Sequence, residues 1–247
     1  MAILLIFSGA ATASGGDFSL CGGGGVFFGG LFTRYTLSAN GQIDGNAVNV
    51  HADQEMNQIN YGAFVFLDGT WVVLNAGIQS GYNTFKEGMI ADSDRGTEMD
   101  TAVSGKGSES MLHINLLGKY PFVLNEQLTL FPLAGVEYQI TLAQYREVGG
   151  RKKYNRTDGI RESDAVGNAY QLSAWNSLLI NIGAGMDIGL SSSLFLRAEL
   201  LYGFRLQTPY EIDMLEKTKK GVNAPNPKLS GLTSGPALKV AAGWRFL

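Results

Sequence analysis

The sequence has little cysteine, little charge and no long apolar run, and each shortage excludes a class of protein. Its one cysteine, Cys21, cannot close a disulfide within the chain, so strand pairing and packing must supply the stability. Charged residues make up 17% of the chain and the net charge is −3, which gives no reason to expect a nucleic-acid partner. No run reaches 18 apolar residues, so we expect no membrane-spanning helix.

Residues that carry chemistry are also scarce. Only two histidines are present, His51 and His113, and neither has a paired histidine at metal-ligand spacing. Ser110 and His113 are too loosely spaced for a catalytic pair, although some eight-stranded barrels are acyl hydrolases. The run Asp92–Glu98 resembles part of a calcium loop, but Val103 holds the place of the late glutamate. We therefore expect no enzymatic activity, no metal and no cofactor.

What the sequence does contain is an alternation of apolar and polar residues. In Leu194–Leu206 an apolar residue occupies every second position, and Arg197, Glu199 and Arg205 lie between them. This period of two is typical of a strand with one apolar face. At about 3.3 Å per residue and a tilt of roughly 40°, the segment is long enough to cross the approximately 25 Å apolar band of an outer-membrane barrel.

Seven more segments alternate in the same way, which predicts eight strands in all. We expect the strands at 26–38, 57–67, 70–85, 111–120, 128–145, 174–188, 194–206 and 236–247. Long loops are expected between them at 39–56, 86–109, 146–172 and 208–234. The short connections include Asp68-Gly69, which is the clearest hairpin signal in the chain. Alternating long and short connections predict an all-β fold, an eight-stranded antiparallel up-and-down transmembrane β-barrel.

Two segments outside the strands have patterns of their own. Ala2–Phe7 is apolar and Ala11-Thr12-Ala13 offers a cleavage site, so we expect 1–13 to be a signal peptide and 14–247 to be a single barrel domain. Within the last loop, 209–221 has proline and acids early, lysines late and glycine at its end, which predicts a short helix at the rim.

The polar face of the strands is mostly Asn, Gln, Gly, Thr and Ser, with few charges. A water-exposed face would carry far more Lys and Glu, so this composition favours a narrow polar lumen with the apolar face in lipid. The side chains expected to form a polar plug in that lumen are Arg34, His113, Lys119, Glu137, Asp187, Arg197, Glu199, Arg205, Lys239 and Arg245.

Aromatic residues suggest two further features. Phe28, Phe32 and Phe131 are expected to make an apolar section of the lumen. The tryptophans and tyrosines gather near the strand ends, as is typical of the aromatic belts at membrane interfaces. We expect Trp71, Trp175, Tyr202 and Trp244 in these belts, although ordinary strand aromatics would show the same pattern.

In length, loop pattern and apolar-lined first strand, residues 26–247 resemble the OmpW/OprG-like group of bacterial eight-stranded outer-membrane barrels. The resemblance implies a bacterial outer-membrane location, outer-membrane lipid as a partner, and passive passage of small hydrophobic molecules. These solutes would leave sideways through the wall near Pro132–Val136 or Gly29-Gly30, where the strand ladder is expected to be weak. The alternative is a non-porin structural or adhesion barrel that meets a host or surface ligand through its extracellular loops.

Overall fold

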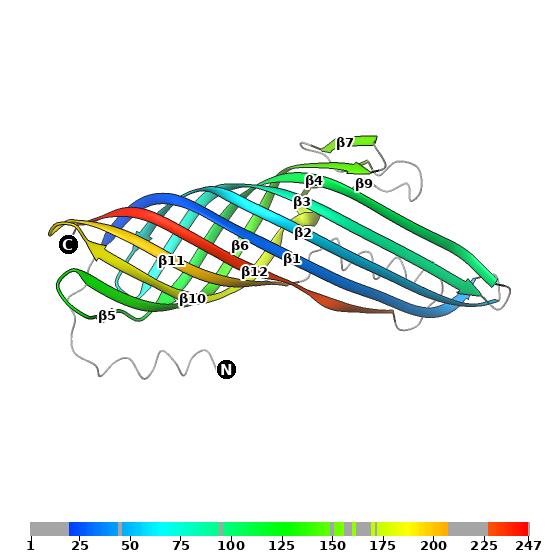
Figure 1. Cartoon of the computed structure of the whole chain (residues 1–247), viewed down its shortest axis with the longest axis horizontal. Helices are drawn as coiled ribbons and strands as arrows, with labels where there is room; N and C mark the ends of the chain where they lie inside the picture. The colour runs from blue at the N-terminus through cyan, green and yellow to red at the C-terminus, as the bar shows by residue number, and fades with distance from the viewer. Residues whose placement is uncertain are drawn as a thin grey trace.

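Antiparallel strands form almost all of the computed structural model, which describes residues 20–43, 46–93, 96–148, 151–155, 160–161, 169–170, 172–206 and 227–246 (Figure 1). The eight long strands are β1 (Cys21–Ile43), β2 (Asn46–Asp68), β3 (Val72–Ser93), β4 (Gly96–Lys119), β6 (Leu128–Val148), β10 (Ser177–Gly189), β11 (Leu194–Arg205) and β12 (Lys228–Arg245). Short elements complete the described part: β5 (Phe122–Val123), β7 (Arg151–Asn155), β8 (Ile160–Arg161), β9 (Ala169–Tyr170) and the 3-10 helix η2 (Leu172–Trp175).

The eight long strands close into a ring, because β12 pairs with β1. Paired positions can be followed once around the ring from Gly23 through Phe66, Asn75, Asn115, Glu137, Leu179, Arg205, Thr233 and back to Thr33. One circuit therefore moves ten residues along β1, from position 23 to position 33. A stagger of this size requires steeply tilted strands, at roughly 40° to the barrel axis. The predicted eight-stranded antiparallel barrel is confirmed.

Alternation along each strand separates a polar inside from an apolar outside. Amides and hydroxyls fill much of the interior, including the buried Gln58, Asn60, Asn75, Gln79, Asn83, Asn115, Gln139, Thr141, Ser177 and Asn181. Exposed apolar side chains cover the outside, including Val26, Phe28, Ile59, Val65, Leu74, Ile78, Ile114, Leu116, Val136, Ile180, Ile182, Leu196, Leu200, Leu238 and Val240. A closed ring of strands with an apolar outer surface and a polar interior is the arrangement that a lipid bilayer requires. The protein is therefore an outer-membrane barrel.

No helix in the described part of the chain is long and apolar enough to cross a membrane.

The two ends of the barrel differ. At the turn end, short connections at 69–71, 120–127 and 190–193 lie beside the C-terminus (Figure 1). At the other end, β1 pairs with β12 only as far as Ser38, and β4 pairs with β6 only from Gly105. Among the described strands, only β1, β2, β3 and β4 continue as a paired sheet beyond these points. Residues 39–43 of β1, 96–104 of β4 and the parts of β2 and β3 between them form what we call the projecting sheet.

The projecting sheet corrects two of the expected loops. Residues 39–43 and 46–56 belong to β1 and β2, and 86–93 and 96–109 belong to β3 and β4. These stretches are polar because their outer face lies beyond the apolar band, while alternate side chains such as Val48 and Val50 remain buried. Polarity alone therefore gave the wrong prediction of a loop.

The other two expected loops are also shorter than predicted. β6 continues to Val148 and β7 pairs back on it, while β12 begins at Lys228. The predicted signal peptide at 1–13 and the predicted helix at 209–221 lie outside the described residues.

Glycine is required where neighbouring strands approach closely. A Cβ atom on Gly135 would lie 2.0 Å from the carbonyl oxygen of Leu116, whereas the nearest atoms to one on Gly189 would be at 3.6 Å, an ordinary contact distance. We expect Gly135→Ala to lower the free energy of unfolding by about 1–3 kcal/mol, as overpacking does elsewhere. Gly189→Ala is the matched control and should be close to neutral. Urea unfolding in lipid vesicles checks this, and equal stability of the two variants would show that the wall absorbs the extra atom.

Candidate functional site

Arg197 is the centre of the interior at the turn end. Its side chain is 1% exposed. The Nε and Nη2 groups donate to the two carboxylate oxygens of Asp187, both at 2.7 Å, and Nη2 also donates to Asp68 Oδ2 at 2.5 Å. Lys119 Nζ donates to the same Asp68 oxygen. These two cations and two carboxylates, which we call the Arg197 cluster, neutralise one another through charge-assisted hydrogen bonds.

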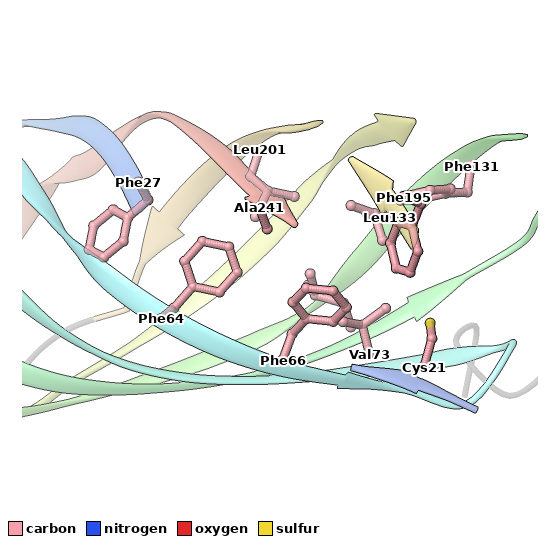
Figure 2. Packing of buried hydrophobic residues seen from close by; sticks show 11 residues of the cluster. Cys21, Phe27, Phe64, Phe66, Val73, Phe131, Leu133, Phe195, Leu201 and Ala241 are labelled. Carbon is pink, nitrogen blue, oxygen red and sulfur yellow. The ribbon is translucent and has the colours of Figure 1, made fainter. Parts of the chain in front are cut away.

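Aromatic rings enclose the Arg197 cluster. The Arg197 Cζ atom lies 4.7 Å from the ring centre of Phe66, 5.2 Å from that of Phe131 and 5.3 Å from that of Phe195. Figure 2 shows Phe66 and Phe195 close together in the interior, with Val73 beside them, and their ring centres are 6.2 Å apart in an edge-on arrangement. Cation–π contacts of this kind are strongest where water is excluded. The Arg197 cluster and its rings close the lumen at the turn end.

Charged and aromatic residues fill the next level of the lumen. Glu199 and Lys239 face each other across β11 and β12, and their residues are 1% and 2% exposed. Glu199 Oε1 lies 3.9 Å from Arg197 Nη1, and Lys239 Nζ lies 5.4 Å from the ring centre of Phe64. Burying these charges is tolerable only because opposite charges lie nearby.

Amide side chains donate hydrogen bonds to the Glu137 carboxylate in the middle of the barrel. Its carboxylate accepts hydrogen bonds from Gln139 at 2.7 Å, Asn115 at 3.0 Å and Asn181 at 3.3 Å. His113 packs edge-on against Phe27, with ring centres 5.0 Å apart. The cavity left at this level has a volume of about 40 Å³, which is room for only a few water-sized molecules.

The lumen is equally crowded towards the projecting sheet. Gln58 donates to Asn60 at 2.7 Å and also to the Glu109 carboxylate. Across β1 and β12, the hydroxyls of Thr33 and Thr233 are hydrogen-bonded at 2.8 Å. The barrel is therefore packed with side chains along its length, as expected for eight strands.

The ladder between β1 and β12 has one interruption. Pairing runs to Gly29↔Ala237 and resumes at Phe32↔Ser234, so Gly30 and Leu31 have no partner in the register with β12. Opposite them lie Gly235 and Pro236. Proline has no backbone N–H to donate across the gap, which accounts for the interruption. We call these four residues, 30–31 and 235–236, the seam.

Hollows lie on both sides of the seam. The interior cavity borders it on the inside. On the outside there is an apolar hollow of about 590 Å³, whose lining includes Phe28, Phe32, Ile59 and Leu238. Gly29, Gly30 and Pro236 line both spaces. Because the glycines have no side chain, the wall between the cavity and the lipid-facing hollow is little more than backbone.

Most of the residues expected in the polar plug do point inward. His113, Lys119, Glu137, Asp187, Arg197, Glu199 and Lys239 have buried side chains in the interior. Arg205 and Arg245 occupy inward positions of β11 and β12 and are half-buried. Phe131 is also inside, at 1% exposure.

The first strand is different, and three predictions for it are wrong. The side chain of Arg34 is 80% exposed and pairs with Glu55 on the outer face. Phe28 and Phe32 are 59% and 55% exposed on the outside, so they do not line the lumen. The buried residues of β1 are Phe27, Leu31, Thr33 and Tyr35. Because β1 carries large apolar residues on both faces, its alternation does not say which face is inside.

Two interior residues of β2, Asp68 and Phe66, were not predicted from the sequence. Asp68 is expected in a turn from its Asp-Gly pair, but it is the last residue of β2 and is 0% exposed. Phe66 lies on the same face, two residues earlier. One signal was available: Asp68 lies on the same face of the strand as Gln58 and Asn60, which are interior residues.

Aromatic residues predicted for the belts lie near the strand ends. Trp71 contacts Tyr120 at the turn end, with ring centres 5.4 Å apart, and Trp244 is 52% exposed. Tyr202 lies on the outside of β11 and its ring centre is 5.1 Å from that of Phe204. Trp175 belongs to η2 and is half-buried.

The described residues contain no group of histidine, cysteine and carboxylate side chains arranged to hold a metal ion.

Comparisons with known proteins find no matching family model and no curated protein with a matching sequence. Among solved structures, the outer membrane protein OprG from Pseudomonas aeruginosa is 12% identical with a TM-score of 0.39, over 93% of this chain and 96% of that one. Neisserial surface protein A is 11% identical with a TM-score of 0.29, over 89% and 95%. Ail of Yersinia pestis is 12% identical with a TM-score of 0.27, over 91% and 99%. Likenesses this weak carry no argument, so the assignment as a membrane barrel rests on the strand pairing and the apolar outer surface.

Removing one partner of the Arg197 cluster should be costly. Asp187→Asn keeps the shape of the side chain but leaves the buried guanidinium without its bidentate partner. We expect the free energy of unfolding to fall by about 3–5 kcal/mol, as for other broken buried ion pairs. Asp53→Asn, at an exposed carboxylate hydrogen-bonded to Thr36, is the control and should have little effect. Urea unfolding in vesicles measures both variants, and an unchanged Asp187→Asn protein would mean that the cluster does not hold the barrel closed.

Proposed function

We propose that the barrel provides a sideways path for small, mostly apolar molecules, from the lumen through the seam into the lipid. The interrupted ladder between β1 and β12 carries this proposal, because it lies between the interior cavity and the apolar outer hollow. In this proposal the projecting sheet lies on the extracellular side, because barrels of this type have short periplasmic turns and long outer segments. Solutes would enter there by displacing side chains such as Gln58 that pack this part of the lumen, and would leave through the seam into the surrounding membrane.

A straight path along the barrel axis is a poorer alternative. Any solute that moved towards the turn end would meet the Arg197 cluster, whose central side chain is held by three hydrogen bonds. Opening it would leave charges unpaired in a buried environment, at a cost of several kcal/mol. Opening the seam breaks one ladder hydrogen bond fewer at residue 236, because proline has no N–H to donate to β1.

Of the two wall regions expected to be weak, only one has an interrupted ladder. β6 stays paired with β10 throughout Pro132–Val136, and it is also paired with β4 from Leu133. The region at Gly29-Gly30 borders the seam. Its glycines and the opposing Pro236 both weaken a strand pair, since glycine packs no side chain and proline removes a donor. The proposed path therefore leaves at Gly29-Gly30.

A second candidate function follows from the projecting sheet. Its strands continue well past the ends of β10 and β11, and their outer face near the barrel carries charged groups such as Arg34, Glu55 and Lys86. Such a surface is suited to contact with a host or a surface ligand. In this alternative the packed lumen serves only to hold the sheet in place.

A reversible staple across β1 and β12 separates these candidates. Thr33 and Thr233 are paired next to the seam, so the variant Cys21→Ser with Thr33→Cys and Thr233→Cys should form a disulfide there. We expect the oxidised protein to lose uptake of indole into vesicles whose outer leaflet is lipopolysaccharide and which contain iodide to quench indole fluorescence. Reduction should restore uptake.

The control is a staple at Ala63→Cys and Ile78→Cys between β2 and β3, in the same Cys21→Ser background. It should leave uptake unchanged in both redox states. If a fully formed disulfide at 33 and 233 did not slow uptake, the sideways path would be abandoned. If the wild-type protein passed no indole at all, the sideways path would be rejected and contact through the projecting sheet would remain as the candidate function.

A further inference from the structure

We infer that the seam favours small apolar molecules that carry one N–H or O–H donor, because the carbonyl group of Gly30 is the hydrogen-bond acceptor on the path. This inference rests on the sideways path proposed above and names the class of solute that it selects. It comes from the backbone geometry around Pro236.

The backbone polar groups of even-numbered residues in this part of β12 face β1. A Cβ atom on Gly25 would lie 2.1 Å from the carbonyl oxygen of Val240, and one on Gly29 would lie 2.9 Å from that of Pro236. Residue 236 would therefore present its N–H to β1 if it had one. In an antiparallel ladder this N–H would bond to the opposing carbonyl, which belongs to Gly30. Proline leaves that acceptor without its ladder donor.

The Gly30 carbonyl points across the seam. Its oxygen lies only 1.9 Å from the position that a Cβ atom on Gly235 would occupy. Gly235 is at an inward position of β12 and lines the interior cavity, so the oxygen reaches the inner side of the seam. A side chain at position 235 would cover this oxygen, and Gly235 has none.

The residues shared by the cavity and the outer hollow offer a solute no polar side chain. The three residues common to the cavity and the outer hollow are Gly29, Gly30 and Pro236, and none has a polar side chain. His113 and Lys239 line only the cavity, while the outer hollow is mainly aromatic and aliphatic. In such surroundings an unpaired carbonyl is costly, and a hydrogen bond to it is stronger than in water.

The preference can be measured with indole and 1-methylindole, which share a ring system but differ in the N–H group. We expect the wild-type protein to take up indole about fivefold faster in the vesicle assay, which corresponds to one net hydrogen bond. Pro236→Ala restores an N–H opposite Gly30 and should remove this preference. An equal preference in the wild-type protein and in Pro236→Ala would overturn the inference, because the difference would then come from the methyl group alone.

A direct measurement covers the case in which Pro236→Ala closes the seam to both probes. The chain has three Gly-Leu pairs, at 30–31, 189–190 and 231–232. Protein labelled with ¹³C at glycine carbonyls and ¹⁵N at leucine therefore gives three carbonyl signals in detergent micelles. Indole should shift the Gly30 signal saturably, 1-methylindole should not, and Gly189 and Gly231 serve as internal controls. The inference would be refuted if indole did not shift the Gly30 signal, or if indole and 1-methylindole shifted it equally.

These outcomes are distinguishable from failure of the proposed function. A saturable Gly30 shift together with an ineffective staple at 33 and 233 would mean that the carbonyl binds donors without lying on a route. An effective staple with no preference for indole would keep the sideways path and remove the selectivity.

Discussion

Lipid offers no hydrogen bonds, so the backbone of this chain must satisfy its own polar groups, and the rest of the structure depends on that constraint. It explains why the strands close into a ring, with β12 paired to β1. It also explains why the apolar side chains lie outside, which leaves the polar ones facing a lumen that eight strands make very narrow. The seam stands out for the same reason, since Gly30 faces a residue that cannot donate.

A narrow lumen has its own electrostatic consequence. The charges placed inside by alternation have little water around them, so each must lie beside an opposite charge or a ring of amides. Arg197 lies between Asp187 and Asp68, and Glu137 accepts from three amide side chains. Ion pairs and charge-assisted hydrogen bonds hold the interior together at the turn end. The wall at the seam has fewer ladder hydrogen bonds than the rest of the β1–β12 pair. This difference is the reason why we propose a sideways opening in preference to an axial one.

Much of this architecture could be predicted from period-two alternation. The number of strands and the inward direction of Arg197, Glu199 and Lys239 follow from it, because apolar and polar residues separate cleanly on those strands. Alternation did not predict the inner face of β1, because Phe27 and Phe28 are both large and apolar but face opposite sides of the wall. It also mistook the projecting sheet for loops, since a strand in water has a polar outer face. The partners of each buried charge depend on the stagger between strands, which no single strand's sequence contains.

The seam also occupies a special place in the connectivity of the chain. Every other pair of long strands in the ring is consecutive along the chain or separated only by short elements, but β1 and β12 are the first and last strands and pair at positions about 200 residues apart. Closing so long a loop costs more conformational entropy than closing a hairpin, although the cost rises only slowly with length. The pair with the missing hydrogen bond is thus also the pair whose separation returns the most freedom to the chain. Its weakness has a topological part that no substitution at Pro236 would remove.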